Sequence, residues 1–140
     1  MWSKTYSTTV TNLKPYQVWM VWSDISKRHL WDLDTEWAKI DGAFKTGAIF
    51  KIKIKNGPVI KMQITDCIPN EKFTDFFKFP LAKMYGIHWM EEIDGVLHLH
   101  TSIKIEGPLS FLWRKLVAEK VFATLPEQTA MAVKLARTIT

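Results

Sequence analysis

The stretch that decides the fold is VLHLHTSIKIEGPLSFLWRKLVAEKVFATL, residues 96–125. Its first part, Val96 to Ile105, alternates between apolar and polar side chains, which is the pattern of a strand with one buried face. Gly107 and Pro108 end the strand, and proline is suited to the first turn of a helix. The residues that follow are compatible with a long helix. A strand that feeds a long terminal helix predicts a curved sheet wrapped around that helix, and such an arrangement tends to enclose a pocket.

The predicted terminal helix has one apolar face. Its members recur at a spacing of three and four residues, as on one side of an α-helix. Pro126 interrupts the pattern, so that either one helix is kinked there or a second helix begins with a capping box formed by Thr124 and Glu127. The apolar face consists of Leu109, Leu112, Trp113, Leu116, Val117, Val121 and Leu125.

Strands dominate the residues before this helix. Phe50, Ile52 and Ile54 alternate with lysines, as do Ile60, Met62 and Ile64 after the turn at Asn56–Pro58, which predicts a sheet with one buried and one solvated face. Consecutive strands joined by short turns should be neighbours, so the segment from Trp37 to Glu106 is predicted to be an antiparallel meander. The other expected elements are a strand over 3–11, a helix from Lys14-Pro15 to about Ser23-Asp24, a short helix over 26–30, and strands over 72–79, 84–93 and 96–105.

Length and composition predict a single domain, residues 1–140. The chain has 140 residues, of which 47% are apolar and 13% aromatic, and this is more bulky side chain than a core of that size needs. No segment approaches the length of a membrane span or resembles a signal peptide, so we expect a cytoplasmic protein. Cys67 has no partner for an internal disulfide and is expected to be a small buried thiol without a catalytic role.

Several residues spread along the chain resemble those of the START-like superfamily, also called SRPBCC or helix-grip, and within it the polyketide cyclase/dehydrase and lipid-transport group. The resemblance lies in the order of Val18-Trp19, Ser23-Asp24, Trp31, Trp37, Gly42, Phe44, Gly47, Phe50, Ile68-Pro69, Phe73, Asp94-Gly95, Gly107-Pro108-Leu109 and Leu112. It implies an α+β fold, with two short helices after the first strand and a seven-stranded antiparallel sheet that grips the C-terminal helix around a ligand cavity. This superfamily has no universal catalytic residues, so the catalytic residues are unknown.

Strand parity predicts which side chains face that cavity. If the lysines of residues 51–61 point to solvent, the alternate residues face the terminal helix. The alternative is that the same apolar residues form a dry core. Trp31 and Tyr85 are expected near the openings through which a ligand enters. The predicted ligand-binding residues are Trp31, Phe50, Ile52, Met62, Phe77, Phe79, Tyr85, Ile87, Trp89, Leu99, Leu112 and Leu116.

Three polar residues share the parity of the predicted cavity wall, namely Asp75, Glu91 and Thr101. A carboxylate inside an apolar cavity would have a raised pKa and could act as a general acid or base, for instance in a cyclisation or dehydration. The alternative is that both carboxylates lie at strand ends in contact with water.

Three histidines, His88, His98 and His100, lie on two consecutive predicted strands. If the hairpin pairs residue 88 with residue 100, the imidazoles share one patch that resembles a three-histidine zinc site. A register shift by one residue would separate them. Since parity places the trio on the solvated face, we expect no metal and no other cofactor.

Nineteen Lys and Arg residues against 14 Asp and Glu give a net charge of +5, and the lysines concentrate on the predicted outer face of the sheet. Such a face favours solubility, or a transient contact with an anionic membrane surface. Apart from Phe76, no aromatic side chain is expected among the lysines, so nucleic acid is not a predicted partner.

The sequence therefore predicts a protein that binds a hydrophobic small molecule or lipid, and transport of that ligand is one form that this function can take. No stable protein partner is expected. Two alternatives stay open. One is an enzyme of the polyketide cyclase/dehydratase type acting on an aromatic or lipid-like substrate, which needs polar groups that converge in the pocket. The other is an interaction module like a chaperone cofactor, which predicts a small cavity and an exposed apolar patch.

Overall fold

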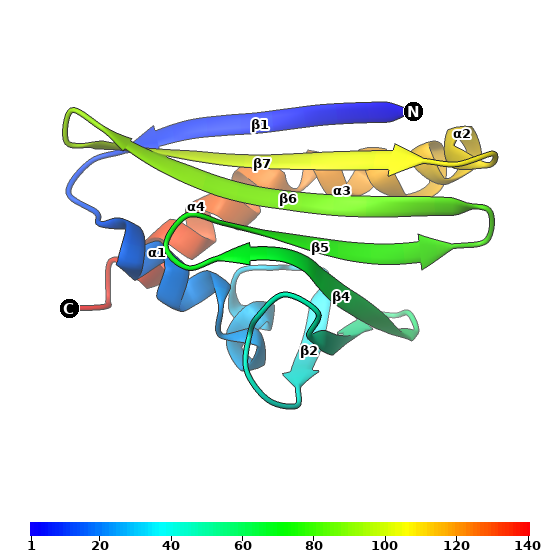
Figure 1. Cartoon of the computed structure of the whole chain (residues 1–140), viewed down its shortest axis with the longest axis horizontal. Coiled ribbons are helices and arrows are strands. Elements are labelled where there is room, and N and C mark those ends of the chain that lie inside the picture. Colours follow the sequence, from blue (N-terminus) through cyan, green and yellow to red (C-terminus); the bar gives the residue numbers. More distant parts are fainter.

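The computed structural model describes residues 1–140 as one antiparallel sheet with helices along one of its faces (Figure 1). No helix is long and apolar enough to cross a bilayer. The strands are β1 (Trp2–Val10), β2 (Thr35–Ile40), β3 (Ile49–Ile54), β4 (Val59–Ile68), β5 (Lys72–Phe79), β6 (Ala82–Ile93) and β7 (Val96–Glu106). The helical elements are α1 (Pro15–Trp22), the 3-10 helix η1 (Ile25–Leu30), α2 (Ser110–Trp113), the π-helical turn η2 (Arg114–Ala118), α3 (Glu119–Ala123) and α4 (Leu125–Ala136).

The seven strands follow the order β1-β7-β6-β5-β4-β3-β2. Strands β2 to β7 form the predicted meander, because each is joined to the next by a short connection and pairs with it. The first strand returns to pair with the last, so that β1 lies at one edge of the sheet and β2 at the other (Figure 1). The predicted fold class, an α+β helix-grip arrangement, is confirmed.

Strands β3 and β4 present the predicted faces. Phe50, Ile52, Met62 and Ile64 are buried under the helices, and the lysines that alternate with them lie on the outer face. On the next strand Phe77 and Phe79 point inward, since they are in phase with the fully buried Phe73. The alternation of residues 50–64 thus identified the inner face of this half of the sheet.

The predicted orientation of β6 was wrong. The hairpin pairs Ile93 with Val96, and from this tight turn the register continues through His88 opposite Thr101 and Trp89 opposite His100. Turn geometry sets hairpin register, and a one-residue difference exchanges the two faces of a strand. Inward-facing positions of β6 are therefore Gly86, His88 and Met90. Tyr85, Ile87, Trp89 and Glu91, which were assigned to the cavity side, lie on the outer face.

Two sequence arguments change with this register. The three imidazoles do not share a patch, because His88 is buried on the inner face whereas His98 and His100 lie outside, where Trp89 stacks on His100 at a centroid distance of 4.9 Å. In addition, the outer face does carry aromatic residues among its lysines. Tyr85 lies 5.2 Å from Phe76, with the Lys104 ammonium 5.5 Å from its ring. The expectation that Phe76 is the one aromatic side chain among these lysines, which was used against nucleic acid, is therefore wrong.

The terminal helix is interrupted twice. One interruption is the π-helical turn η2. Four members of the predicted apolar face, Trp113, Val117, Val121 and Leu125, line the cavity under the sheet. Leu112 is 40% exposed and Leu116 is 50% exposed, so the prediction that they close the cavity was wrong. A new helix, α4, begins at Leu125 with a proline in its first turn. The predicted capping box is absent, because the Thr124 hydroxyl donates backwards to the Val121 carbonyl oxygen at 2.7 Å.

The hydrophobic core has two parts. One cluster joins α1 and α4 to the middle strands and includes Trp22, Trp31, Phe50 and Phe73. The other packs α3 and η2 against the opposite ends of β5, β6 and β7 and includes Phe79, Ile105 and Ala118. Side chains of both clusters line one cavity, which lies between them.

A candidate ligand cavity

The cavity has a volume of about 440 Å³ and lies between the inner face of the sheet and the C-terminal helical segment. Its wall is mostly apolar, with aromatic side chains from β5 and from α2. A set of polar residues occupies one side. The apolar part consists of Ile52, Ile54, Ile60, Met62, Phe77, Phe79, Met84, Ile103, Trp113, Val117, Val121 and Leu125.

Four of the predicted ligand-binding residues line this cavity: Ile52, Met62, Phe77 and Phe79. Three others are buried in the adjoining core without reaching the cavity, as the dry-core alternative expected; they are Trp31, Phe50 and Leu99. The remaining five lie elsewhere. Tyr85, Ile87 and Trp89 are on the outer face of β6, and Leu112 and Leu116 point to solvent from the helical segment.

The cavity opens to solvent beside the β3–β4 hairpin. Among the lining residues, Asp34 and Pro58 are exposed, and they lie in the loop before β2 and in the hairpin turn. Trp31 was predicted to lie near an opening, and the residues that follow it supply Asp32, Asp34 and Thr35 to the wall. Trp31 itself does not lie at the opening, because it is 2% exposed and packs in the core.

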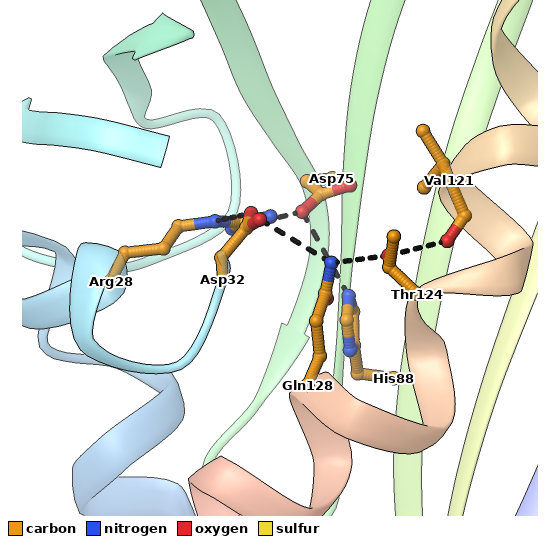
Figure 2. Close-up of polar contacts among 7 residues, drawn as sticks. All are labelled: Arg28, Asp32, Asp75, His88, Val121, Thr124 and Gln128. Atoms are coloured by element: carbon orange, nitrogen blue, oxygen red, sulfur yellow. Dashed lines mark hydrogen bonds and ion pairs between the residues drawn. The ribbon is translucent and has the colours of Figure 1, made fainter. Parts of the chain in front are cut away.

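A buried ionic cluster forms the polar side of the cavity (Figure 2). Arg28 projects from η1 and donates from Nε to Asp32 Oδ2 at 3.1 Å and from its Nη1 atom to Asp75 Oδ2 at 3.2 Å. All three side chains are buried or nearly so, with Asp75 only 3% exposed. The spacing of four residues places Arg28 and Asp32 on the same side of a helical turn, whereas Asp75 arrives from the middle of β5.

Gln128 connects this cluster to the C-terminal helix α4. Its Nε2 atom donates to Asp32 Oδ1 at 3.3 Å and to Thr124 Oγ1 at 2.7 Å. Its other amide atom, Oε1, accepts no hydrogen bond. Figure 2 shows the resulting chain of contacts, which runs from η1 through the carboxylates to the first turn of α4. The cluster therefore holds together the three structural elements that surround one side of the cavity.

His88 packs beside the cluster as a neutral imidazole. Burial, and secondly the Arg28 charge, lowers the pKa of His88 from 6.5 to about 3. The ring stacks on Phe73 with a centroid distance of 4.3 Å and contacts the Thr101 hydroxyl through Nδ1 at 3.5 Å. Its Nε2 atom is 3.9 Å from Asp75 Oδ2. Because His88 is uncharged at neutral pH, it adds no positive charge to the site.

The two ion-pair partners Arg28 and Asp75 have shifted pKa values. Burial raises the pKa of Asp75, even though Arg28 and the backbone amide of Gly86 act in the opposite direction. Burial by itself would lower the pKa of Arg28, but Asp75 and Asp32 outweigh it and raise that pKa. Arg28 therefore stays charged, while Asp75 is a carboxyl group that can exchange a proton closer to neutral pH than an exposed aspartate does.

Sequence reasoning identified Asp75 but missed Arg28 and Gln128, and it placed His88 on the wrong face of the sheet. The four-residue spacing of Arg28 and Asp32 was a usable signal for an ion pair. His88 could have been placed inside by extending the register from the Asp94-Gly95 turn. No local pattern marks Gln128, because its partner Asp32 is 96 residues away in the chain.

No family model and no curated protein matches the chain. Solved structures do match it along nearly its whole length. A hypothetical protein from Helicobacter pylori aligns with a TM-score of 0.76 at 10% identity, covering 96% of this chain and 87% of that one. The chain has the START-like, helix-grip fold. This confirms the resemblance read from the sequence at the level of the fold.

Two helix-grip structures with described activities also align. Norcoclaurine synthase from Thalictrum flavum, in complex with dopamine and hydroxybenzaldehyde, matches with a TM-score of 0.67 at 15% identity over 99% of this chain and 89% of that one. The di-domain aromatase/cyclase StfQ of the steffimycin biosynthetic pathway matches with a TM-score of 0.69 at 11% identity, over 97% of this chain and 50% of that one. Identities this low show a shared fold.

Proposed function

We propose that this protein binds a hydrophobic small molecule in the cavity between its sheet and its C-terminal helical segment. The observation that carries the proposal is the cavity itself, about 440 Å³ in volume with 12 hydrophobic residues among the 21 that line it. That volume lies within the usual range for small-molecule sites, roughly 300 to 1,000 Å³. An apolar wall with a few convergent polar groups is also the usual composition of such sites.

The norcoclaurine synthase structure supports the proposal by analogy, since a protein of the same fold holds dopamine and hydroxybenzaldehyde. The interaction-module alternative receives less support, because it predicted a small cavity. The charged groups of the wall are Arg28, Asp32 and Asp75 in the buried cluster and Asp34 at the opening, so the polar group of a lipid would have to lie at one of these two places.

Native mass spectrometry of the freshly purified protein tests the proposal. We expect a discrete mass adduct that is lost on denaturation, and saturable binding of added fatty alcohols, sterols or aromatic polycycles by protein stripped of it. Protein without an adduct that also shows no saturable binding of any of these compounds would contradict the proposal.

A second candidate function is catalysis by Asp75. This carboxyl group is buried on the cavity wall with a raised pKa, and it lies 3.9 Å from a neutral imidazole nitrogen of His88. Such a group can donate or accept a proton next to a bound substrate, as a cyclisation or dehydration requires. Incubation of the co-purified ligand with fresh protein separates the two functions, because an enzyme changes the ligand's mass or spectrum and a binding protein returns it unchanged.

A further inference from the structure

Negative side chains outnumber positive ones on the cavity wall. The lining includes Asp32, Asp34 and Asp75, whereas Arg28 is the one cationic lining residue and no lysine reaches the wall. His88 adds no charge at neutral pH, since its pKa is lowered to about 3. The cavity is therefore locally negative in a protein whose net charge is +5.

The buried cluster has acceptors that remain free. Arg28 is shared between two carboxylates, Asp32 and Asp75. Asp75 also accepts from the Gly86 amide, but an ionised carboxylate can accept about four hydrogen bonds, so lone pairs are left. The Oε1 atom of Gln128 is a further acceptor without a donor, because that side chain uses only its NH₂ group. A ligand group that lies here is thus met mainly by acceptors.

We infer that the cavity selects apolar ligands that carry a hydrogen-bond donor, and that an amine lying against Asp75 is bound best. This inference rests on the proposed function, because it specifies the polar end of the ligand that the cavity holds. An ammonium group would balance the second carboxylate and form a charge-assisted hydrogen bond where little water competes. A ligand carboxylate is disfavoured, since it would bring another negative charge to two carboxylates that share one cation.

The state of Asp75 agrees with this assignment. Burial raises its pKa in spite of the nearby guanidinium, and a cation bound beside the carboxyl group would favour the ionised form. The net charge of the whole molecule makes the opposite prediction. A protein with a charge of +5 attracts anions at long range, so a preference for cationic ligands has to come from the cavity.

Four naphthalene probes of similar size test the inference by titration calorimetry at neutral pH. They are naphthylmethylamine, which is protonated, naphthylmethanol, ethylnaphthalene and naphthoate. We expect the amine to bind about tenfold more tightly than ethylnaphthalene, the factor that a charge-assisted hydrogen bond supplies. The alcohol should be intermediate and naphthoate weakest. An equal affinity for all four, or tightest binding of naphthoate, overturns the inference and leaves the proposed function standing.

Asp75→Asn is the matched variant, because it removes the charge and keeps the shape of the side chain. We expect it to abolish the preference for the amine while ethylnaphthalene binds as before; a preference that survives contradicts the assignment to Asp75. Asp66→Asn is the control, since Asp66 pairs with Lys72 on the outer face and its loss removes the same charge away from the cavity. If Asp75→Asn fails to fold, the order in which the wild-type protein binds the four probes, from tightest to weakest, still tests the inference. Absence of saturable binding for all four probes overturns the proposed function itself.

Discussion

Gly86 lies directly opposite Asp75 in the antiparallel pair β5–β6, and the absence of a side chain at Gly86 leaves the space that the Asp75 carboxylate occupies. A Cβ atom added at residue 86 would lie 2.5 Å from Asp75 Oδ1, closer than such atoms approach in proteins. The glycine interrupts a run of larger side chains in β6, where it would otherwise weaken a strand. The buried carboxylate of Asp75 therefore explains why residue 86 is a glycine.

Gly86→Ala should accordingly destabilise the protein, by about 1 to 3 kcal/mol, because the carboxylate has to leave its contacts with Arg28. Alanine normally stabilises a strand interior relative to glycine by roughly 0.5 to 1 kcal/mol. Without the contact to Asp75, Gly86→Ala would therefore be expected to stabilise the protein. Urea denaturation followed by tryptophan fluorescence measures the difference. In an Asp75→Ala background the clash is gone, and Gly86→Ala should become neutral or stabilising; an equal cost in both backgrounds would count against this geometry.

Phe76 and Phe77 are adjacent in the chain but lie on opposite faces of β5. Phe77 lines the cavity, whereas Phe76 packs on Tyr85 outside. We expect Phe77→Ala to weaken binding of naphthylmethanol several-fold and Phe76→Ala to leave the affinity unchanged. Fluorescence titration measures both. Trp89→Ala should also leave the affinity unchanged, because Trp89 is on the outer face; a loss of affinity in Phe76→Ala or Trp89→Ala would place the ligand on the wrong side of the sheet.

Leu116 and Val117 test the phase of the helical segment. Leu116 is 50% exposed, so Leu116→Gln should change the free energy of unfolding by no more than about 0.5 kcal/mol. Val117 lines the cavity, and Val117→Gln should both lower stability and weaken probe binding. Paired denaturation and binding curves for the two variants check which of the two side chains faces the cavity. The reverse result would indicate that Leu116, and not Val117, lines it.

His88 makes the free energy of unfolding depend on pH. Its pKa falls from 6.5 in the unfolded chain to about 3 in the folded protein, so the folded state binds this proton less well. The stability that His88 provides is complete above pH 6.5 and is lost as the pH falls toward 3, by up to about 4 kcal/mol. Asp75 acts in the opposite direction, because its raised pKa lets the folded protein take up a proton at a pH where the unfolded chain has not.

The comparison of wild type with His88→Gln isolates this contribution. Glutamine can still contact Thr101 but does not titrate, so the variant should be less stable at pH 7 and should lose less stability on acidification. Urea midpoints measured from pH 7 to pH 4 give the two slopes. Parallel pH profiles for the two proteins would show that His88 is not the buried neutral group described above.

The first half of the sheet could be predicted from sequence because its pattern is redundant. Lysines alternate with apolar residues through β3 and β4, so residues 50–64 have one face that can be buried. β6 lacks this redundancy, since Ile87 and Trp89 on one face are as apolar as Met84 and Met90 on the other. In β6 the register set by the Asp94-Gly95 turn determines which side chains face the cavity, and this register places His88 on the inner face.

The polar side of the cavity could be predicted only in part. Asp75 was found from parity alone, because it lies in phase with Phe77 and Phe79. Its partners come from η1 and α4, and contacts between distant segments such as Gln128 to Asp32 leave no periodic signal in the chain. The helical segment failed for a different reason. The predicted apolar face was too wide, because its members Leu112 and Leu116 are exposed, and a π-helical turn at residues 114–118 interrupts the regular spacing that such a prediction assumes.

The methionine methyl groups provide the most direct measurement of whether a ligand occupies the cavity. Met62 and Met84 line it, Met90 is buried in the core nearby, and Met20 is 55% exposed outside it. In a methyl-labelled protein titrated with naphthylmethanol, we predict saturable shifts of the Met62 and Met84 resonances, with one affinity for both, while Met20 stays unchanged. Unchanged Met62 and Met84 resonances at saturating probe, or shifts confined to Met20, would contradict binding in the cavity.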